Sequence, residues 1–258
     1  MEIIQNELNT VKKYILENFK DPFPEKNLEK FMAGKSKMIR SVLAILWIKA
    51  SGAELSENIY KILSAGEIIH NASLLHDDVI DDAEKRRGDD TFGIKFTPKI
   101  SIIAGDYLVS FAIEKLNSVN NPNIINNFKK CIENMALAEI KQYFLKNSKP
   151  DIDTYIEICR GKTAYLFQTI LENCATTVNL PDENARFFAE NFGILFQIKN
   201  DLHEESAKND KINGVMTAKD IIGIENTLIL SDNYRGKLKS ILATLPDNRY
   251  KRALEDLI

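Results

Sequence analysis

The sequence predicts an all-α protein, and three observations favour this fold class. Only 11 glycines and 7 prolines interrupt its 258 residues. The long intervals between them carry apolar residues at helical spacing, and alternating strand patterns are scarce. The composition, 44% hydrophobic and 28% charged, is that of an ordinary globular chain. Because no repeat, low-complexity tract or linker divides the sequence, we expect one domain over residues 1–258.

The helical spacing predicts eight helices. The first lies at the amino terminus, where MEIIQNELNTVKKYILENF places charges between apolar residues, unlike a signal peptide. The third ends in an acidic turn, and the longest connection, 83–99, follows it. The seventh carries an aromatic stripe, Phe188, Phe192 and Phe196, which is typical of core packing. The predicted ranges are 3–19, 38–51, 55–82, 100–117, 123–146, 152–176, 183–206 and 217–232.

Charge, hydropathy and cysteine usage exclude several classes of protein. The net charge of -3 predicts no general attraction to nucleic acid or acidic lipid, so any anion site must be local. No apolar run approaches the roughly 20 residues that a membrane span needs. Cys131, Cys159 and Cys174 lie far apart without metal-type spacing, which indicates buried thiols in a reducing compartment. We therefore expect a soluble, cytoplasmic protein.

An acidic turn lies within LLHDDVIDDAEKRRG, residues 74–88. Helical geometry places His70, Ser73, Asp77 and Asp81 in one narrow arc, with Asp78 at its edge. Carboxylates four residues apart repel by about 3 kcal/mol at an effective dielectric near 20, but by under about 1 kcal/mol in water. A solvated acidic face is therefore one interpretation. The apolar neighbours favour a cleft instead, where Mg²⁺ would bridge the carboxylates to substrate phosphates.

A second oxygen-rich face follows in FQIKNDLHEE, residues 196–205. Gln197, Asn200, Asp201 and Glu204 share this face by the same helical arithmetic. Two such faces, each flanked by apolar residues, suggest opposite walls of one cavity. A cavity of this kind suits a metal–diphosphate complex.

In its motifs the chain resembles the trans-isoprenyl diphosphate synthases, or polyprenyl synthetases, and in particular their long-chain heptaprenyl and octaprenyl members. The resemblance implies an isoprenoid-synthase-type helical bundle around a central cavity, two or three Mg²⁺ ions and a homodimer. Only 28 residues follow position 230, so the carboxyl-terminal part is short for the family. The matching segments, in order, are KMIR at 37–40, DDVID at 77–81, RRG at 86–88, AGDYL at 104–108, GKTAYLF at 161–167, FQI at 196–198 and AKD at 218–220.

The resemblance also implies roles for these residues. The catalytic set would be Asp77, Asp78, Asp81, Arg86 and Lys162. The metal ligands would be Asp77, Asp81, Asn200, Asp201 and Glu204, with Asn200 in place of the usual carboxylate. The allylic diphosphate would contact Arg86, Lys162, Thr163 and Gln197, and isopentenyl diphosphate would contact Lys37, Arg40, His70 and Arg87. Lys219 is a further substrate-binding candidate. Taken singly, each has a simpler interpretation as a solvated charge, a core histidine or a buried amide.

Product length is expected to depend on Ala72 and Ser73. Ser73 lies about 6 Å, or one turn, below Asp77, where the allylic tail would first run. Farnesyl-forming relatives carry an aromatic residue there, so two small residues imply a longer product, in the heptaprenyl to octaprenyl range of quinone tails. Such a product implies peripheral membrane contact for its release. The alternative is that Ala72 and Ser73 only permit close helix packing.

The resemblance implies a Mg²⁺-dependent prenyltransferase that condenses isopentenyl diphosphate with an allylic diphosphate, geranyl or farnesyl, to make a longer all-trans polyprenyl diphosphate. Three other functions stay open. A farnesyl or geranylgeranyl diphosphate synthase would use the same site. A class I terpene cyclase has the second motif NDxx(S/T)xxxE, which begins at Asn200 but fails at Glu204 and Lys208. A non-catalytic subunit of a heteromeric prenyl synthase would explain the altered second motif, although such subunits tend to lose the first one.

Overall fold

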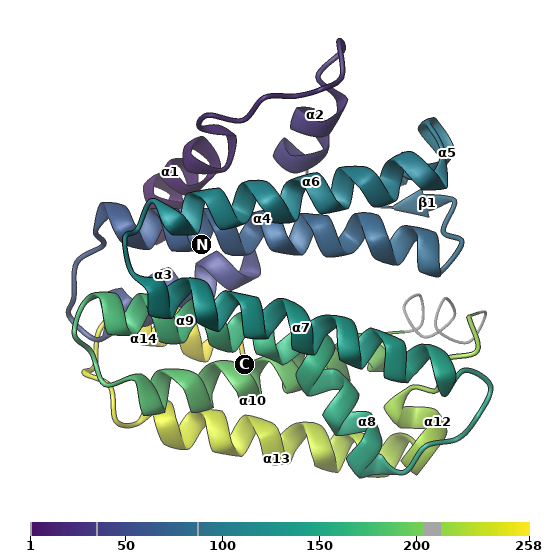
Figure 1. Ribbon diagram of the computed structural model, residues 1–258. Helices are drawn as coiled ribbons and strands as arrows, with labels where there is room; N and C mark the ends of the chain where they lie inside the picture. Colours follow the sequence, from purple (N-terminus) through teal and green to yellow (C-terminus); the bar gives the residue numbers. More distant parts are fainter. Residues whose placement is uncertain (1, 35, 87, 204–212) are drawn as a thin grey trace. The chain divides into compact units, whose positions relative to one another are not determined.

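The computed structural model describes residues 2–34, 36–86, 88–203 and 213–258, and its fold is all-α (Figure 1). The predicted fold class is thus confirmed. The chain divides into two compact units, Met1–Val42 with Leu55–Ile125 and Leu43–Glu54 with Asn126–Ile258. Helices α3 (Ile39–Ala50) and α7 (Pro122–Phe144) pass from one unit into the other.

Two long helices, α4 (Glu57–Ile80) and α6 (Pro98–Asn117), run side by side in the first unit (Figure 1). Helix α4 begins after Ser56, whose hydroxyl accepts a hydrogen bond from the Ile59 N–H and so caps the first turn. The two helices are also joined by the Ser101 hydroxyl, which donates to the Leu75 carbonyl at 3.0 Å. The unit is completed by η1 (Glu2–Ile4), α1 (Gln5–Leu16), α2 (Asn27–Ala33) and α5 (Phe92–Lys95).

A small β-hairpin follows the carboxyl end of α4. Its strands β1 (Lys85–Arg86) and β2 (Asp89–Asp90) are antiparallel, and Gly88 makes the turn at a φ of 88°. Only glycine adopts such a φ readily. The Thr91 hydroxyl donates to the Ala83 carbonyl at 2.8 Å, and the Ala83 N–H donates to the Asp78 carbonyl at 2.9 Å. These bonds hold the hairpin against the last turn of α4.

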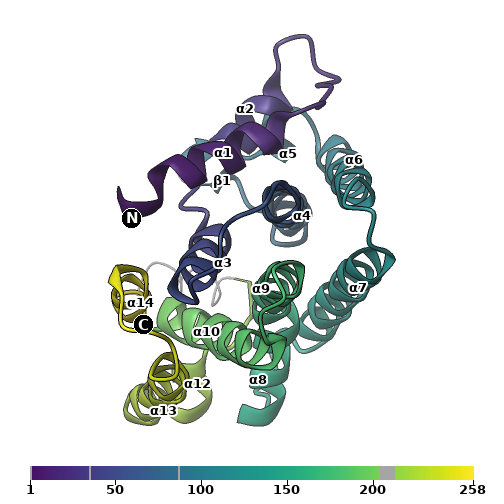
Figure 2. The same ribbon diagram turned by 90° about the vertical axis from the view of Figure 1, so that its left-hand side faces the viewer.

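Helix α10 (Asp182–Leu202) packs against α9 (Tyr165–Thr177) and α13 (Ile224–Leu242) in the second unit (Figure 2). Its aromatic stripe stacks at centroid spacings of 6.3 Å from Phe188 to Phe192 and 6.4 Å from Phe192 to Phe196. Trp47 of α3 lies 4.9 Å from Phe188. The stripe therefore belongs to the core. The other elements are α8 (Ile152–Cys159), the π-helical segment η2 (Arg160–Ala164), α12 (Ala218–Ile222) and α14 (Arg249–Glu255).

The predicted helices match the observed ones with four kinds of difference, and one of them is that α13 continues to Leu242, beyond the predicted end at residue 232. The range 152–176 is interrupted by η2, and the range 217–232 is broken at Gly223, whose φ is 80°. Three short helices, α2, α5 and α14, were not predicted. The last residues of the range 183–206 lie outside the described part of the chain. In that described part, no helix combines the length and apolarity needed to cross a membrane.

The cysteines agree with their prediction as buried thiols. Cys131, Cys159 and Cys174 are all free and buried. Burial raises the pKa of the Cys174 thiol, because the thiolate would lose its hydration.

Candidate active site

The acidic motif of the first unit lies at the carboxyl end of α4. Asp77 and Asp78 belong to its last turn, and Asp81 is the residue that ends the helix. This end of a helix carries the negative pole of its macrodipole, which disfavours further negative charge. Three carboxylates at this place therefore need compensating cations.

Arg86 supplies one such cation to Asp78. The Arg86 Nε donates to Asp78 Oδ1 at 2.6 Å, and the Asp78 side chain is 1% exposed. The second oxygen, Asp78 Oδ2, is buried and has no hydrogen-bond partner among the described residues. Burial raises the pKa of Asp78, although the guanidinium of Arg86 acts in the opposite direction. The site on α4 therefore retains a buried oxygen that another cation or donor would satisfy.

The other predicted residues of the first unit differ in exposure. Arg40 is buried, Lys37 is exposed, and His70 is half-buried. Ala72 is buried, whereas Ser73 is half-buried and its hydroxyl donates to the His70 carbonyl at 2.9 Å. Arg87 lies outside the described residues.

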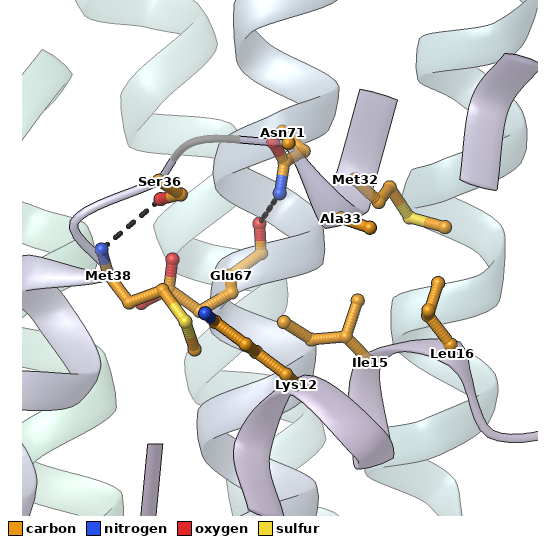
Figure 3. A pocket seen from close by; sticks show the side chains of 10 residues that line it. Lys12, Ile15, Leu16, Met32, Ala33, Ser36, Met38, Glu67 and Asn71 are labelled. Carbon is orange, nitrogen blue, oxygen red and sulfur yellow. Dashed lines mark hydrogen bonds between the residues drawn. The ribbon is translucent and has the colours of Figure 1, made fainter. Parts of the chain in front are cut away.

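A buried carboxylate fixes the chain next to Arg40. Glu67 of α4 is 1% exposed, and its Oε1 accepts from the Ser41 N–H at 3.2 Å and from the Ser41 hydroxyl at 2.7 Å. A cavity of about 50 Å³ lies beside it, between α1, α2 and α4 (Figure 3). This volume holds a few water molecules and is too small for a prenyl diphosphate. Its lining includes Lys12, Ile15, Met32, Ser36, Met38 and Asn71.

The AGDYL motif is explained by a histidine that sequence reasoning missed. The His76 Nε2 lies 3.2 Å from the Ile102 carbonyl and 3.2 Å from Asp106 Oδ1. The ring lies over Gly105, where an added Cβ would come within 2.3 Å of Nε2. His76 therefore joins α6 to α4 immediately before Asp77. The pairing of a histidine with a glycine far along the chain leaves no periodic signal in the sequence.

The GKT segment of the second unit forms a π-helical turn, η2. The turn packs closely on both sides. A Cβ on Gly161 would lie 2.4 Å from Ala138, and one on Gly193 would lie 2.4 Å from the Cα of Ala164. The Lys162 Nζ lies 2.5 Å from Glu139 Oε2 of α7. π-helical turns occur frequently at functional sites, and the role predicted for this segment stays a prediction.

A hydrogen-bonded network extends from η2 to the carboxyl end of α10. The Thr163 hydroxyl lies 3.3 Å from Gln197 Oε1, and Gln197 Nε2 donates to Asp201 Oδ1 at 2.9 Å. Asp201 Oδ2 accepts from the Tyr155 hydroxyl at 2.7 Å and from the Ala218 N–H at 3.0 Å. Burial raises the pKa of Asp201, whereas these donors and the nearby Lys219 act in the opposite direction. Sequence reasoning missed Tyr155.

The structure thus brings Thr163, Gln197 and Asp201 together and places Lys219 near them. Asn200 is half-buried, and Glu204 lies outside the described residues. Among residues 2–34, 36–86, 88–203 and 213–258, no three His, Cys, Asp or Glu side chains cluster closely enough to hold a metal ion. Asp77 and Asp81 belong to one unit and Asp201 to the other, so the meeting of the two acidic faces stays a prediction.

Residues 22–253 match the model of the family described as polyprenyl synthetase. This match covers most of the chain. The chain belongs to the polyprenyl synthetase family. The resemblance inferred from the motifs is thereby confirmed.

Two relatives and one solved structure illustrate the polyprenyl synthetase family. A prenyl transferase from Cyanidium caldarium is 30% identical over 193 residues, which cover 72% of this chain and 59% of the relative. Component 2 of a heptaprenyl diphosphate synthase from Geobacillus stearothermophilus is 30% identical over 237 residues, with 90% of this chain and 70% of the relative covered. The chain thus spans less than two thirds of the length of the Cyanidium relative.

The crystal structure of a polyprenyl synthase from Caulobacter crescentus has the same fold. Its TM-score is 0.85 at 23% identity, and the comparison covers 99% of this chain and 94% of that one. That protein was crystallised in complex with calcium and isoprenyl diphosphate.

Proposed function

We propose that the chain is a Mg²⁺-dependent prenyltransferase. It condenses isopentenyl diphosphate with an allylic diphosphate, geranyl or farnesyl, to make a longer all-trans polyprenyl diphosphate. The observation that carries the proposal is the carboxyl end of α4. There the DDxxD motif of the family gathers three carboxylates at the negative helix pole, and one buried oxygen of Asp78 lacks a hydrogen-bond partner among the described residues.

The donor set fits a hard divalent cation. Carboxylate oxygens are the ligands that Mg²⁺ prefers, and it commonly combines one or two of them with substrate phosphates. We assign this role to Asp77 and Asp81, with Asn200, Asp201 and Glu204 as candidates on the second motif. Bound magnesium would neutralise the charge that develops on the departing diphosphate. Calcium in the Caulobacter relative is a cation of the same kind.

The basic residues receive the two diphosphates. Arg86, Lys162, Thr163 and Gln197 are assigned to the allylic diphosphate, and Lys37, Arg40, His70 and Arg87 to that of isopentenyl diphosphate. Lys219 is a further substrate-binding candidate. Cleavage of the allylic carbon–oxygen bond leaves a carbocation, which the isopentenyl double bond attacks. A carbon–carbon bond forms, and the proton that is lost passes to the departing diphosphate. Fixed donors aimed at the leaving oxygens stabilise this charge as it develops.

The product is proposed to be longer than farnesyl diphosphate and to serve as a quinone side chain. Ser73 is small and half-buried, so its side chain does not obstruct a tail that passes along α4 below Asp77. The Geobacillus relative bears a heptaprenyl name. The experiment below measures the number of isoprene units in the product.

We further propose a cytoplasmic homodimer that contacts membranes peripherally. Exposed apolar side chains support an additional interface. Ile103 of α6, in the first unit, is 61% exposed, and Phe144 of α7, in the second unit, is 79% exposed. Sedimentation of the purified protein measures its oligomeric state directly.

The test is elongation by the purified protein. It is incubated with Mg²⁺, farnesyl diphosphate and labelled isopentenyl diphosphate, and the products are sized by chromatography. Asp77→Asn is expected to lower the rate by about 100-fold or more, because it removes a charged ligand and keeps the side-chain shape. Asp82→Asn is the matched control, since Asp82 is exposed and asparagine accepts its φ of 47°. Equal rates for the two variants would contradict the proposal.

Product length provides a second readout. Ser73→Phe is expected to shorten the product, because an aromatic ring would project into the path of the tail. An unchanged length distribution would show that the tail runs elsewhere.

Hydrocarbon release without isopentenyl diphosphate would indicate a terpene cyclase, and a wild-type protein active only with a partner subunit would indicate a heteromeric synthase.

A further inference from the structure

Asp201 is engaged on both of its oxygens, although its place in the second acidic motif predicts a metal ligand. The side chain is 2% exposed. Oδ1 accepts from Gln197, and Oδ2 accepts from both Tyr155 and the backbone of Ala218. A carboxylate has about four lone-pair sites, and three are therefore taken. These donors come from α8, α10 and α12, so one buried carboxylate joins three helices of the second unit.

The network also fixes the orientation of the Gln197 amide. An ionised carboxylate only accepts hydrogen bonds, so Gln197 must present its NH₂ group to Asp201. Its carbonyl Oε1 is then turned towards the Thr163 hydroxyl, at 3.3 Å. The second N–H of Gln197 is left in a defined direction, away from Asp201. A diphosphate oxygen is a suitable acceptor for it.

We infer that Asp201 is a positioning residue, and that Tyr155 anchors it, so that Gln197, Thr163 and Lys219 are held for the diphosphate. The inference rests on the proposed function. Tyr155 is 6% exposed and donates to Asp201 at 2.7 Å, which places its hydroxyl inside the network. The bond from Ala218 fixes the first turn of α12, the helix that carries Lys219.

Tyr155→Phe separates this role from metal ligation, because the two predict opposite results. If Asp201 binds metal, the Tyr155 hydroxyl competes for its oxygen, and removing that hydroxyl lowers the Mg²⁺ concentration needed for half-maximal activity. If Asp201 positions Gln197, the same change loosens the network. The KM for the allylic diphosphate then rises by roughly threefold to tenfold, the range that corresponds to the net contribution of a typical intramolecular hydrogen bond. The half-maximal Mg²⁺ concentration at saturating substrate stays unchanged.

Tyr234→Phe is the matched control. Tyr234 is 7% exposed in the same unit, and among the described residues no hydrogen bond joins its hydroxyl to Asp201. Asp201→Asn is the second variant and is expected to raise the same KM, because an amide oxygen cannot replace two carboxylate oxygens. Thermal melts followed by circular dichroism check that each variant is folded.

The outcomes are distinguishable. A raised KM in Tyr155→Phe, with Tyr234→Phe unchanged, supports the inference. A lowered Mg²⁺ requirement, or a KM equal to that of Tyr234→Phe, overturns it while leaving the proposed function intact. A wild-type protein that elongates no allylic diphosphate removes the proposed function, and the inference falls with it.

Discussion

The packing of Gly193 against η2 yields a quantitative prediction. In Gly193→Ala the new Cβ would lie 2.4 Å from the Cα of Ala164, about 1 Å short of the 3.4 Å at which ordinary contact begins. A backbone atom cannot swing aside as a flexible side chain does. Overpacking of this kind costs about 1–3 kcal/mol, and replacing a mid-helix glycine by alanine gains roughly 0.5–1 kcal/mol. We expect a net loss of up to about 2.5 kcal/mol in the free energy of unfolding, the difference between these two effects.

Gly236→Ala is the control for this prediction. Gly236 lies within α13 of the same unit, and a Cβ there would meet nothing within 4 Å. It should therefore show only the helix-propensity gain, roughly 0.5–1 kcal/mol. Urea unfolding followed by circular dichroism measures the free energy of unfolding of both variants. The KM for the allylic diphosphate should also rise in Gly193→Ala, because the turn that carries Lys162 must move. If Gly193→Ala proves as stable as Gly236→Ala, the close approach is refuted.

Three further predictions concern single groups. Glu139→Gln should lower the KM for the allylic diphosphate about threefold, since Lys162 loses an anionic competitor at 2.5 Å; initial rates measure this, and a higher KM would show that Glu139 holds Lys162 in its productive position. Burial lowers the pKa of Lys115 in the folded protein. Between this lowered pKa and 10.5, the unfolded chain therefore binds more protons at Lys115 than the folded protein does. The contribution of Lys115 to the free energy of unfolding rises with pH across that range. Between pH 7 and 10.5, the free energy of unfolding of wild type should increase relative to that of Lys115→Met. A constant difference between the two proteins would contradict the predicted sign. The buried cysteines should resist iodoacetamide at pH 8 and react in denaturant, as mass spectrometry detects; labelling of the folded protein would show that they are accessible.

The helices were predictable because their periodicity is strong, whereas their interruptions were not. Helix α4 was expected over 55–82 and spans Glu57–Ile80. The π-helical turn at 160–164 depends on contacts with Ala138 and Gly193, which lie far away in sequence. The break at Gly223 had a local signal, since glycine tolerates a φ of 80°. Asn248 likewise caps α14 by accepting from the N–H groups of Tyr250 and Lys251, a signal that the sequence contained.

The candidate site was predictable as two helix faces but not as a set of bonds. The arc of α4 was expected to place Asp78 at its edge, and the structure buries it against Arg86. Gln197 and Asp201 were expected on one face, and their 2.9 Å bond agrees with that expectation. Tyr155 could not be inferred, because a tyrosine on an amphipathic helix is ordinary core composition until its hydroxyl is seen to donate.

The π-helical turn has a consequence for how the gene tolerates length changes. In a π-helical turn the backbone hydrogen bonds join residues i and i+5, so the turn contains one residue more than a turn of α-helix. Without that extra residue, the flanking helices α8 and α9 would continue each other as one regular α-helix. Deletion of a single codon within 160–164 is therefore expected to leave both helices folded and their buried faces unchanged, while displacing Lys162 and Thr163. Within a regular α-helix, deletion of one residue is normally disruptive, because it rotates all the following side chains by about 100° about the helix axis.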